Sequence, residues 1–394
     1  MLKYVEKIII SAFIIVNLIS FLSLDVAKVF YNLKFIMIVL VAFILFSQRI
    51  ITKKPIIINK INAKLFKTGL IWVGLLGFSL FQSENLTSAL LNLASYLLLL
   101  LLAFIIIPSS NVDIISYNNI WLWSVTLVFA FAILMGLLSY TSLSYINPSD
   151  LRIRYNFSFI NPNSAALFAY LGVMETLTLC IIDAMKKRYI ATMIFFLIVV
   201  YLSDSRTPLL ALVIGVLFYT LSLLITKLRV NSLVFITVSL MGMWVALIIL
   251  FGYLQIPFSR LNELSSFRLA NWNVEIQQLS GIKWLVGFGL DAQADSIIVA
   301  NQITFDSSYI QQLIRTGLLG FLGMSGFIIT TIRSVRQIDD KKVKRFALSM
   351  LLAWLFYGIT ENPFFAASNA TSVYIWTNIG LLIHNFTSLN SFPK

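Results

Sequence analysis

Charged residues are scarce in this chain, and the side chains that most often bind metals are nearly missing. Charged residues make up 11% of the 394 residues, against roughly 25% in a soluble domain. There is one histidine, His384, and one cysteine, Cys180. A lone cysteine excludes an intramolecular disulfide, and no Cys/His spacing indicates zinc. The sequence also lacks a P-loop and a kinase-like glycine loop, so we expect no metal and no other cofactor.

Apolar residues are abundant instead, and their arrangement predicts an all-α polytopic membrane protein. The sequence is 59% hydrophobic with a mean hydropathy of +0.91. A membrane-crossing helix needs about 20 apolar residues, and about twelve segments approach that length. We expect one transmembrane domain over 1–394, with a long loop outside the cytoplasm at 252–306. The predicted spans are 8–24, 29–47, 65–82, 89–107, 119–139, 163–183, 189–202, 207–226, 231–251, 308–331, 345–361 and 371–387.

Lysine and arginine set the expected orientation. The net charge is +13, but basic residues gather in cytoplasmic loops of membrane proteins, so this excess does not indicate nucleic acid. If both termini are cytoplasmic, most basic residues lie on the cytoplasmic side. We interpret the first apolar run as an uncleaved signal anchor. The cations left outside are mainly arginines, whose planar fork suits bidentate phosphate contacts. They include Arg152, Arg154, Arg206, Arg260 and Arg268.

The stretch RIRYNFSFINPN, residues 152–163, places two arginines and three aromatics before an Asn-Pro-Asn turn. Arg152 and Arg154 alternate, so an extended loop would aim both the same way, toward an anionic group. Tyr155 offers an aromatic face for stacking, and Asn161 and Asn163 offer amide groups for hydrogen bonds beside the two arginines. The alternative is a solvated loop edge with a packing role for the aromatic.

Arg206 lies in the polar connector SDSRTP between two predicted spans. Because Pro208 suits the first turn of a helix, Arg206 is expected beside a helix N-terminus, where anions bind readily. The alternative is an interfacial anchor. Arg268, on a short helix predicted within the long loop, is a weaker candidate whose alternative is a surface charge.

The span that begins near residue 308 carries Ser308, Gln312 and Arg315 on one helical face. Arg315 is expected roughly 10 Å below the outer surface. An arginine that faces lipid there is costly, so Arg315 should face a polar cavity, with Asp306 at its mouth. Snorkelling, or a structural pair with a carboxylate, is the alternative.

Two further carboxylates fall at predicted spans. Glu361 ends the span 345–361, where it could orient an arginine, act as a base, or simply lie at the interface. Glu175 lies near the middle of 163–183, where an ionisable group is a functional hypothesis and a protonated structural carboxylate is the alternative. We interpret His384 as structural.

Four stretches, in their order, resemble the O-antigen polymerase and ligase superfamily, the Wzy-type polysaccharide polymerases. They are RIRYNFSFINPN, SDSRT, FRLANW followed by GFG, and DSSYIQQLIRTGLLGFLG. They cover roughly residues 150–330, and the N-terminal spans match only in hydrophobicity. The resemblance implies a C-type glycosyltransferase-like bundle that uses undecaprenyl-diphosphate-linked oligosaccharides at the outer face of the cytoplasmic membrane. Ligase relatives carry a histidine near the start of the last motif, where this chain has Asp306, which favours a polymerase.

The resemblance implies that a growing glycan leaves its lipid diphosphate for a lipid-linked repeat unit. Preorganised cations would stabilise the leaving diphosphate without a metal, so Arg206 and Arg315 are our first candidates. Asp306 is the candidate base, with Glu361 in reserve. The expected substrate-binding residues are Arg152, Arg154, Arg268, Tyr155, Asn161, Asn163, Tyr309 and Gln312.

Two other functions remain open at this point. An O-antigen ligase-type transferase would make a single transfer, and a lipid-linked oligosaccharide flippase would place its binding groups near the midplane. Besides the lipid-linked substrate and membrane lipids, the candidate partners are a repeat-unit flippase and a chain-length-regulating co-polymerase.

Overall fold

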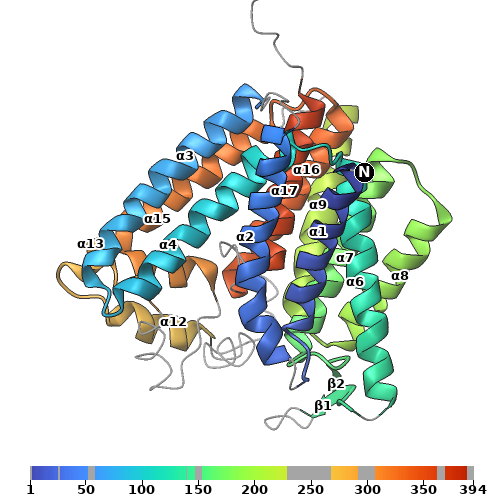
Figure 1. The fold of residues 1–394 in the computed structure, drawn as a ribbon, viewed down its shortest axis with the longest axis horizontal. Coiled ribbons are helices and arrows are strands. Elements are labelled where there is room, and N and C mark those ends of the chain that lie inside the picture. The colour runs from blue at the N-terminus through green and yellow to red at the C-terminus, as the bar shows by residue number, and fades with distance from the viewer. Residues whose placement is uncertain are drawn as a thin grey trace, which may run out of the picture.

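The computed structural model describes residues 2–24, 27–51, 58–138, 140–146, 153–228, 268–291, 307–361 and 369–387, and these are mostly helical (Figure 1). The predicted span 231–251 lies outside them, as do Arg152, Arg260 and Asp306. The helices are α1 (Leu2–Ile19), α2 (Ala27–Ile51), α3 (Lys60–Gly77), α4 (Leu86–Leu101), α5 (Ile107–Ser109), α6 (Ile114–Leu137), α7 (Pro162–Ile182), α8 (Lys187–Leu202), α9 (Arg206–Leu228), α12 (Arg268–Gln277), α13 (Lys283–Val286), α15 (Ser308–Val335), α16 (Lys341–Thr360) and α17 (Ala370–Phe386).

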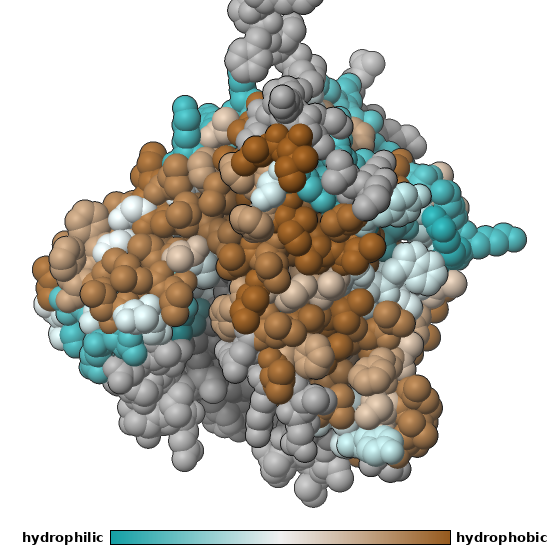
Figure 2. Space-filling view, in the orientation of Figure 1, coloured by the Kyte–Doolittle hydropathy of each residue, from teal (hydrophilic) through white to brown (hydrophobic). Residues whose placement is uncertain are grey.

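The lengths and compositions of these helices are those of a multi-pass membrane protein, as the sequence predicts. Within the described residues, 7 helices are long and apolar enough to cross a membrane. They are Leu33–Ile51, Lys60–Gln82, Leu86–Ser109, Ile114–Leu137, Pro162–Ile182, Arg206–Leu224 and Ser308–Val335. On the face shown in Figure 2, apolar side chains form a broad band across the middle, while hydrophilic ones gather at the upper rim, along the right side and in a patch at the lower left.

Helices α7 and α17 form the interior of the bundle, because both are buried along nearly their whole length. Helix α7 packs against α6, α8 and α16, and α17 packs against α6 and α16 and against the π-helical turn Leu102–Ile106 that continues α4. Large aromatic side chains fill the spaces between helices. Trp121 contacts Tyr374 with ring centroids 5.1 Å apart, and Tyr170 contacts Tyr357 at 5.3 Å. Such pairs contribute beyond the area they bury.

A short hairpin covers one end of the bundle, and we call this the hairpin end. Strand β1 (Ser144–Ile146) pairs antiparallel with β2 (Ile153–Tyr155), and Tyr145 lies opposite Arg154. In Figure 1, β1, β2 and α12 lie at this lower end, while the N-terminus lies at the opposite end. The predicted extended segment therefore exists at 153–155.

The segment after β2 is hydrogen-bonded to the loop between α1 and α2. The backbone N–H of Ser23 donates to the Ser158 carbonyl at 2.8 Å, and that of Ile160 donates to the Phe21 carbonyl at 2.8 Å. Phe157 (φ 49°) and Ser158 (φ 65°) both adopt left-handed backbone conformations, which are uncommon for residues other than glycine. The Ser158 hydroxyl donates to the Ala132 carbonyl near the end of α6 at 2.7 Å. These bonds fix the segment against the α1–α2 loop and α6.

Candidate functional site

The hairpin end collects the stretches that the sequence singled out. Strand β2, the start of α7, the turn between α8 and α9 and the helix α12 all lie at this end (Figure 1). Arg268 is the first residue of α12, and its side chain, like Arg152 and Asp306, lies outside what the structure describes. The site must therefore be built from the remaining candidates.

Arg154 joins three elements of the hairpin end. Its Nε donates to the Ser203 carbonyl at 3.0 Å and its Nη2 donates to Asn163 Oδ1 at 2.8 Å. Asn163 Oδ1 also accepts from the Ser205 hydroxyl at 3.2 Å. A half-buried guanidinium thus connects β2 to the first turn of α7 and to the α8–α9 turn. Two motifs that are 49 residues apart at this contact meet in space.

The α8–α9 turn presents Arg206 as the first residue of α9. Ser203 and Ser205 are buried, whereas Arg206 is exposed. Asp204 adopts a left-handed conformation with φ 47°, which Asp tolerates better than most residues and which turns the chain sharply into α9. The N-terminus of α9 adds a partial positive charge beside the guanidinium of Arg206. The geometry of this turn suits an anion.

Other candidates from the 152–163 stretch have local structural roles. Asn161 caps α7, since its Oδ1 accepts from the Ser164 backbone N–H at 2.8 Å, and Pro162 follows in the first turn. Tyr155 is 41% exposed and lies tilted against Phe157, with ring centroids 6.0 Å apart. Its substrate contact stays a prediction.

Helix α15 is broken at Gly317, next to Arg315. Gly317 has φ 61° and ψ −165°, outside the helical region. Because of the break, the carbonyls of Ile314 and Arg315 are free to accept hydrogen bonds from outside the helix. The Phe288 backbone N–H donates to the Ile314 carbonyl at 2.9 Å, and the Gly289 N–H donates to the Arg315 carbonyl at 3.0 Å. The GFG motif is therefore a loop that docks on a broken helix.

Only glycine fits where this loop meets α15. A Cβ added to Gly287 would lie 2.3 Å from the Arg315 backbone, and one added to Gly317 would lie 2.4 Å from the Leu285 backbone. The loop is also fastened to the start of α4, because Asp291 Oδ2 accepts from the Asn85 backbone N–H at 2.8 Å. We define residues 283–291, with these contacts, as the docking loop.

The remaining α15 candidates bind neighbouring helices. Gln312 Oε1 accepts from the Tyr96 hydroxyl at 3.4 Å, and Gln312 Nε2 donates to Thr316 Oγ1 at 3.1 Å. The Tyr309 hydroxyl donates to the Leu355 carbonyl at 2.8 Å. Gln312 is buried and Arg315 is half-buried on the same helix. The predicted substrate contacts of Gln312 and Tyr309 would have to replace these bonds.

Glu361 lies at the junction of α15 and α16. It follows the last residue of α16, and its carbonyl accepts from the backbone N–H of Ser308 at 3.2 Å and from the Ser308 hydroxyl at 2.9 Å. The start of α15 is thus held to the end of α16. Among the described residues, no group of three His, Cys, Asp or Glu side chains could hold a metal ion.

The sequence did not predict the break at Gly317, the docking of the GFG motif or the shared acceptor at Asn163. Glycines within an apolar helical pattern were the available signal for the break. The structure joins Arg154 to Asn163 and to the turn that precedes Arg206, and it places the backbone of Arg315 beside the docking loop. No protein-family model matches the chain, and no curated protein is significantly similar to it.

Proposed function

We propose that the chain is a polysaccharide polymerase, a glycosyltransferase embedded in the cytoplasmic membrane. It transfers a growing glycan from undecaprenyl diphosphate to a lipid-linked repeat unit. The observation that carries the proposal is the contact of Arg154 with Asn163 and with the turn that begins α9 at Arg206. Two cationic motifs thereby share the hairpin end, as a diphosphate site requires.

The proposed membrane arrangement follows the charge distribution. About twelve helices cross the bilayer in a C-type glycosyltransferase-like bundle, and both termini are cytoplasmic. The hairpin end then faces outward, together with the long loop at 252–306. Nucleotide sugars are absent outside the cell, so the diphosphate linkage of the donor supplies the driving force.

The reaction exchanges one carbon–oxygen bond for another. A hydroxyl oxygen of the acceptor attacks the anomeric carbon of the donor, and the bond from that carbon to the diphosphate breaks. The electron pair leaves with the diphosphate, and the hydroxyl proton passes to a carboxylate, for which Asp306 is first and Glu361 is second. Arg206 and Arg315 stabilise the charge on the leaving group.

We assign Arg154 a different role from the substrate binding that the sequence predicts for it. Its Nε and Nη2 donate to protein acceptors. Arg154 is therefore proposed as a positioning residue, which fixes the α8–α9 turn and with it the guanidinium of Arg206.

Glycan synthesis by the purified protein tests the proposal. The protein in detergent is supplied with polyprenyl-diphosphate-linked repeat units, and the products are separated on a gel. We expect a ladder from the wild type. A single charge-assisted contact contributes about 1.5–3 kcal/mol, so Arg206→Ala or Arg315→Ala should slow ladder formation by roughly ten- to a hundredfold.

The matched control is Arg336→Ala, which removes an exposed arginine just after α15, at the far end of that helix from Ser308. This variant should make wild-type ladders. Wild-type ladders from both Arg206→Ala and Arg315→Ala would remove the diphosphate role. A flippase cannot extend glycans in detergent, and a ligase would give a single transfer without a ladder.

A further inference from the structure

A network of neutral polar side chains lies inside the bundle, separate from the hairpin-end site. Asn118 Nδ2 of α6 donates to Asn378 Oδ1 of α17 at 3.1 Å, and the Tyr374 hydroxyl donates to Asn118 Oδ1 at 2.9 Å. Asn378 Nδ2 lies 3.1 Å from the Tyr374 hydroxyl and 3.4 Å from Thr178 Oγ1 of α7. All four residues are buried with 0% exposure. We call these four residues the core network.

Glu175 adjoins the core network on α7. It precedes Thr178 by three residues, so the two side chains share one helical face. Its exposed fraction is 0%, and neither carboxyl oxygen has a hydrogen-bond partner among the residues the structure describes. It lies about 20 Å along α7 from the start of that helix, deep within the apolar region.

A bare carboxylate cannot persist in these surroundings. Burying an isolated charge is so unfavourable that the group must be paired or neutralised. No basic side chain in the described part of the chain forms an ion pair with Glu175. The fully buried titratable side chains on α7 and on the helices around it are phenols: Tyr117 on α6, Tyr170 on α7, Tyr189 on α8, Tyr357 on α16 and Tyr374 on α17. The basic residues of these helices lie in the first turns of α8 and α16 and, as His384, in the last turn of α17. Phenols are neutral near pH 7, so the compensating charge must come from solution.

We propose that Glu175 and the core network bind one monovalent cation, H⁺ or Na⁺. A single carboxylate balances a single positive charge, whereas a divalent ion would leave excess charge in a dry interior. The network supplies hydroxyl and amide oxygens, which are the neutral hard ligands that alkali and alkaline-earth cations prefer. For H⁺, the bound proton is that of the carboxylic acid itself, which makes the buried side chain neutral. The site is independent of glycosyl transfer.

Carbodiimide labelling tests the site directly. Dicyclohexylcarbodiimide adds to protonated carboxyls in apolar surroundings and leaves a stable acylurea, which mass spectrometry locates on a peptide. We expect a single adduct on the α7 peptide of the wild-type full chain in detergent, and none there in Glu175→Gln. The matched control is Glu84→Gln, which changes an exposed carboxylate and should leave the adduct unchanged.

The two cations are distinguished by competition. If Na⁺ is bound, replacing choline chloride by NaCl at constant pH and ionic strength should reduce labelling at least tenfold. If H⁺ is bound, labelling should fall as the pH rises and should not respond to Na⁺. Thermal unfolding of both proteins provides a second readout, because a ligand that binds the native state raises its stability.

Glu175→Gln carries the neutral isostere, so its unfolding temperature should lose the response to the bound cation. The proposal is overturned if labelling is absent or insensitive to pH and Na⁺ while the unfolding temperatures of wild type and Glu175→Gln respond identically to both. Ladder synthesis by Glu175→Gln is measured separately, so a failure of the polymerase proposal does not decide this one.

Discussion

Replacing Gly317 by alanine should release the docking loop from α15. Gly317 lies at φ 61° and ψ −165°, a region that only glycine adopts readily, and forcing another residue there costs about 1–3 kcal/mol. The added Cβ would also lie 2.4 Å from the Leu285 backbone, and overpacking of this kind costs typically another 1–3 kcal/mol. Together the penalty is about 2–6 kcal/mol.

This penalty matches or exceeds the contribution of the hydrogen bonds that join the loop to α15. The two amides of Phe288 and Gly289 that donate to α15 contribute about 1 kcal/mol each in net terms. We therefore expect the loop to detach from α15 before the bundle unfolds, while the bonds of Leu290 and Asp291 keep its end attached near the start of α4. Arg315, whose carbonyl is one of the two acceptors, would then lose its fixed position.

Hydrogen exchange measured by mass spectrometry in detergent detects the detachment. In the wild type, the peptide covering 283–291 should exchange slowly. Loss of about 2 kcal/mol of docking free energy should accelerate exchange at Phe288 and Gly289 by roughly thirtyfold. Peptides from α7 and α17 should exchange at wild-type rates, and ladder synthesis should fall with loop release.

Two control glycines separate the strain from the clash. Gly326→Ala is in the same helix with no atom within 4 Å of the added Cβ, so it should be neutral or stabilising by about 0.5–1 kcal/mol. Gly281→Ala has φ 54° but equally open surroundings, so it should show the strain alone. If Gly317→Ala exchanges at the same rate as Gly326→Ala, the docking account is wrong.

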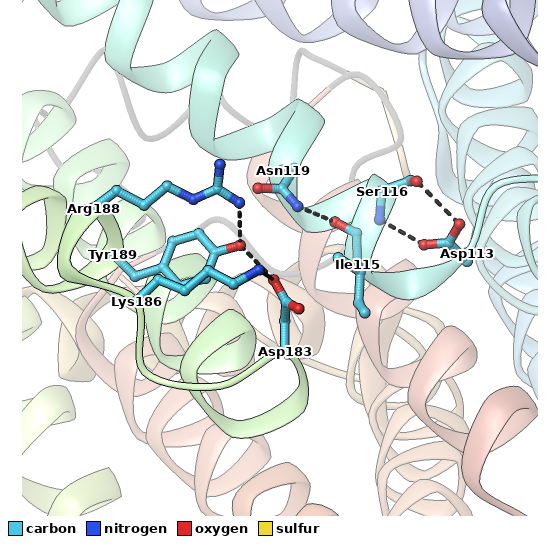
Figure 3. A network of polar contacts seen from close by, with 8 residues as sticks. All are labelled: Asp113, Ile115, Ser116, Asn119, Asp183, Lys186, Arg188 and Tyr189. Carbon is cyan, nitrogen blue, oxygen red and sulfur yellow. Dashed lines mark hydrogen bonds and ion pairs between the residues drawn. The ribbon is translucent and has the colours of Figure 1, made fainter.

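Three further variants test other parts of the structure. Asn163→Ala removes the acceptor that two hydrogen bonds share. If each bond is worth about 1 kcal/mol, ladder synthesis should fall about tenfold and the unfolding temperature should fall slightly; unchanged synthesis would contradict the positioning role. Gly380→Ala places a Cβ 2.1 Å from a carbonyl oxygen, while Gly74→Ala meets no atom within 4 Å; only the first should destabilise the protein, by about 1–3 kcal/mol in denaturant unfolding. The hydrogen bond from Lys186 is the largest of the effects that lower the pKa of Asp183 (Figure 3). The ionised Asp183 therefore stabilises the fold above about pH 4, and this stabilisation is lost as the pH falls. Asp183→Asn should remove this acid-sensitive part of the unfolding temperature.

The helices were the most predictable part of the fold. Eleven of the twelve predicted spans overlap described helices, because long apolar runs have few other solutions in a bilayer. The Asn161-Pro162 pair correctly marks a helix start. The ends of the helices were less predictable than their existence. Helices α1 and α2, for example, both begin before the apolar run that predicts them.

The contacts of the candidate site were less predictable, since they depend on partners far away in the sequence. The helical pattern of α15 continues through Gly317, and only the docking loop, about thirty residues earlier, explains the break. Alternation predicts the face that Arg154 uses, but it cannot show that a backbone carbonyl at Ser203 accepts from its guanidinium. Glu175 was identified as a buried ionisable group, whereas its lack of a partner among the described residues required coordinates.

The backbone bonds from Ser23 and Ile160 join the α1–α2 loop to the segment after β2. A shift of the first two helices would therefore be transmitted to the strand that carries Arg154. Because Arg154 in turn binds the carbonyl of Ser203, the N-terminal helix pair is mechanically coupled to the turn at which α9 begins.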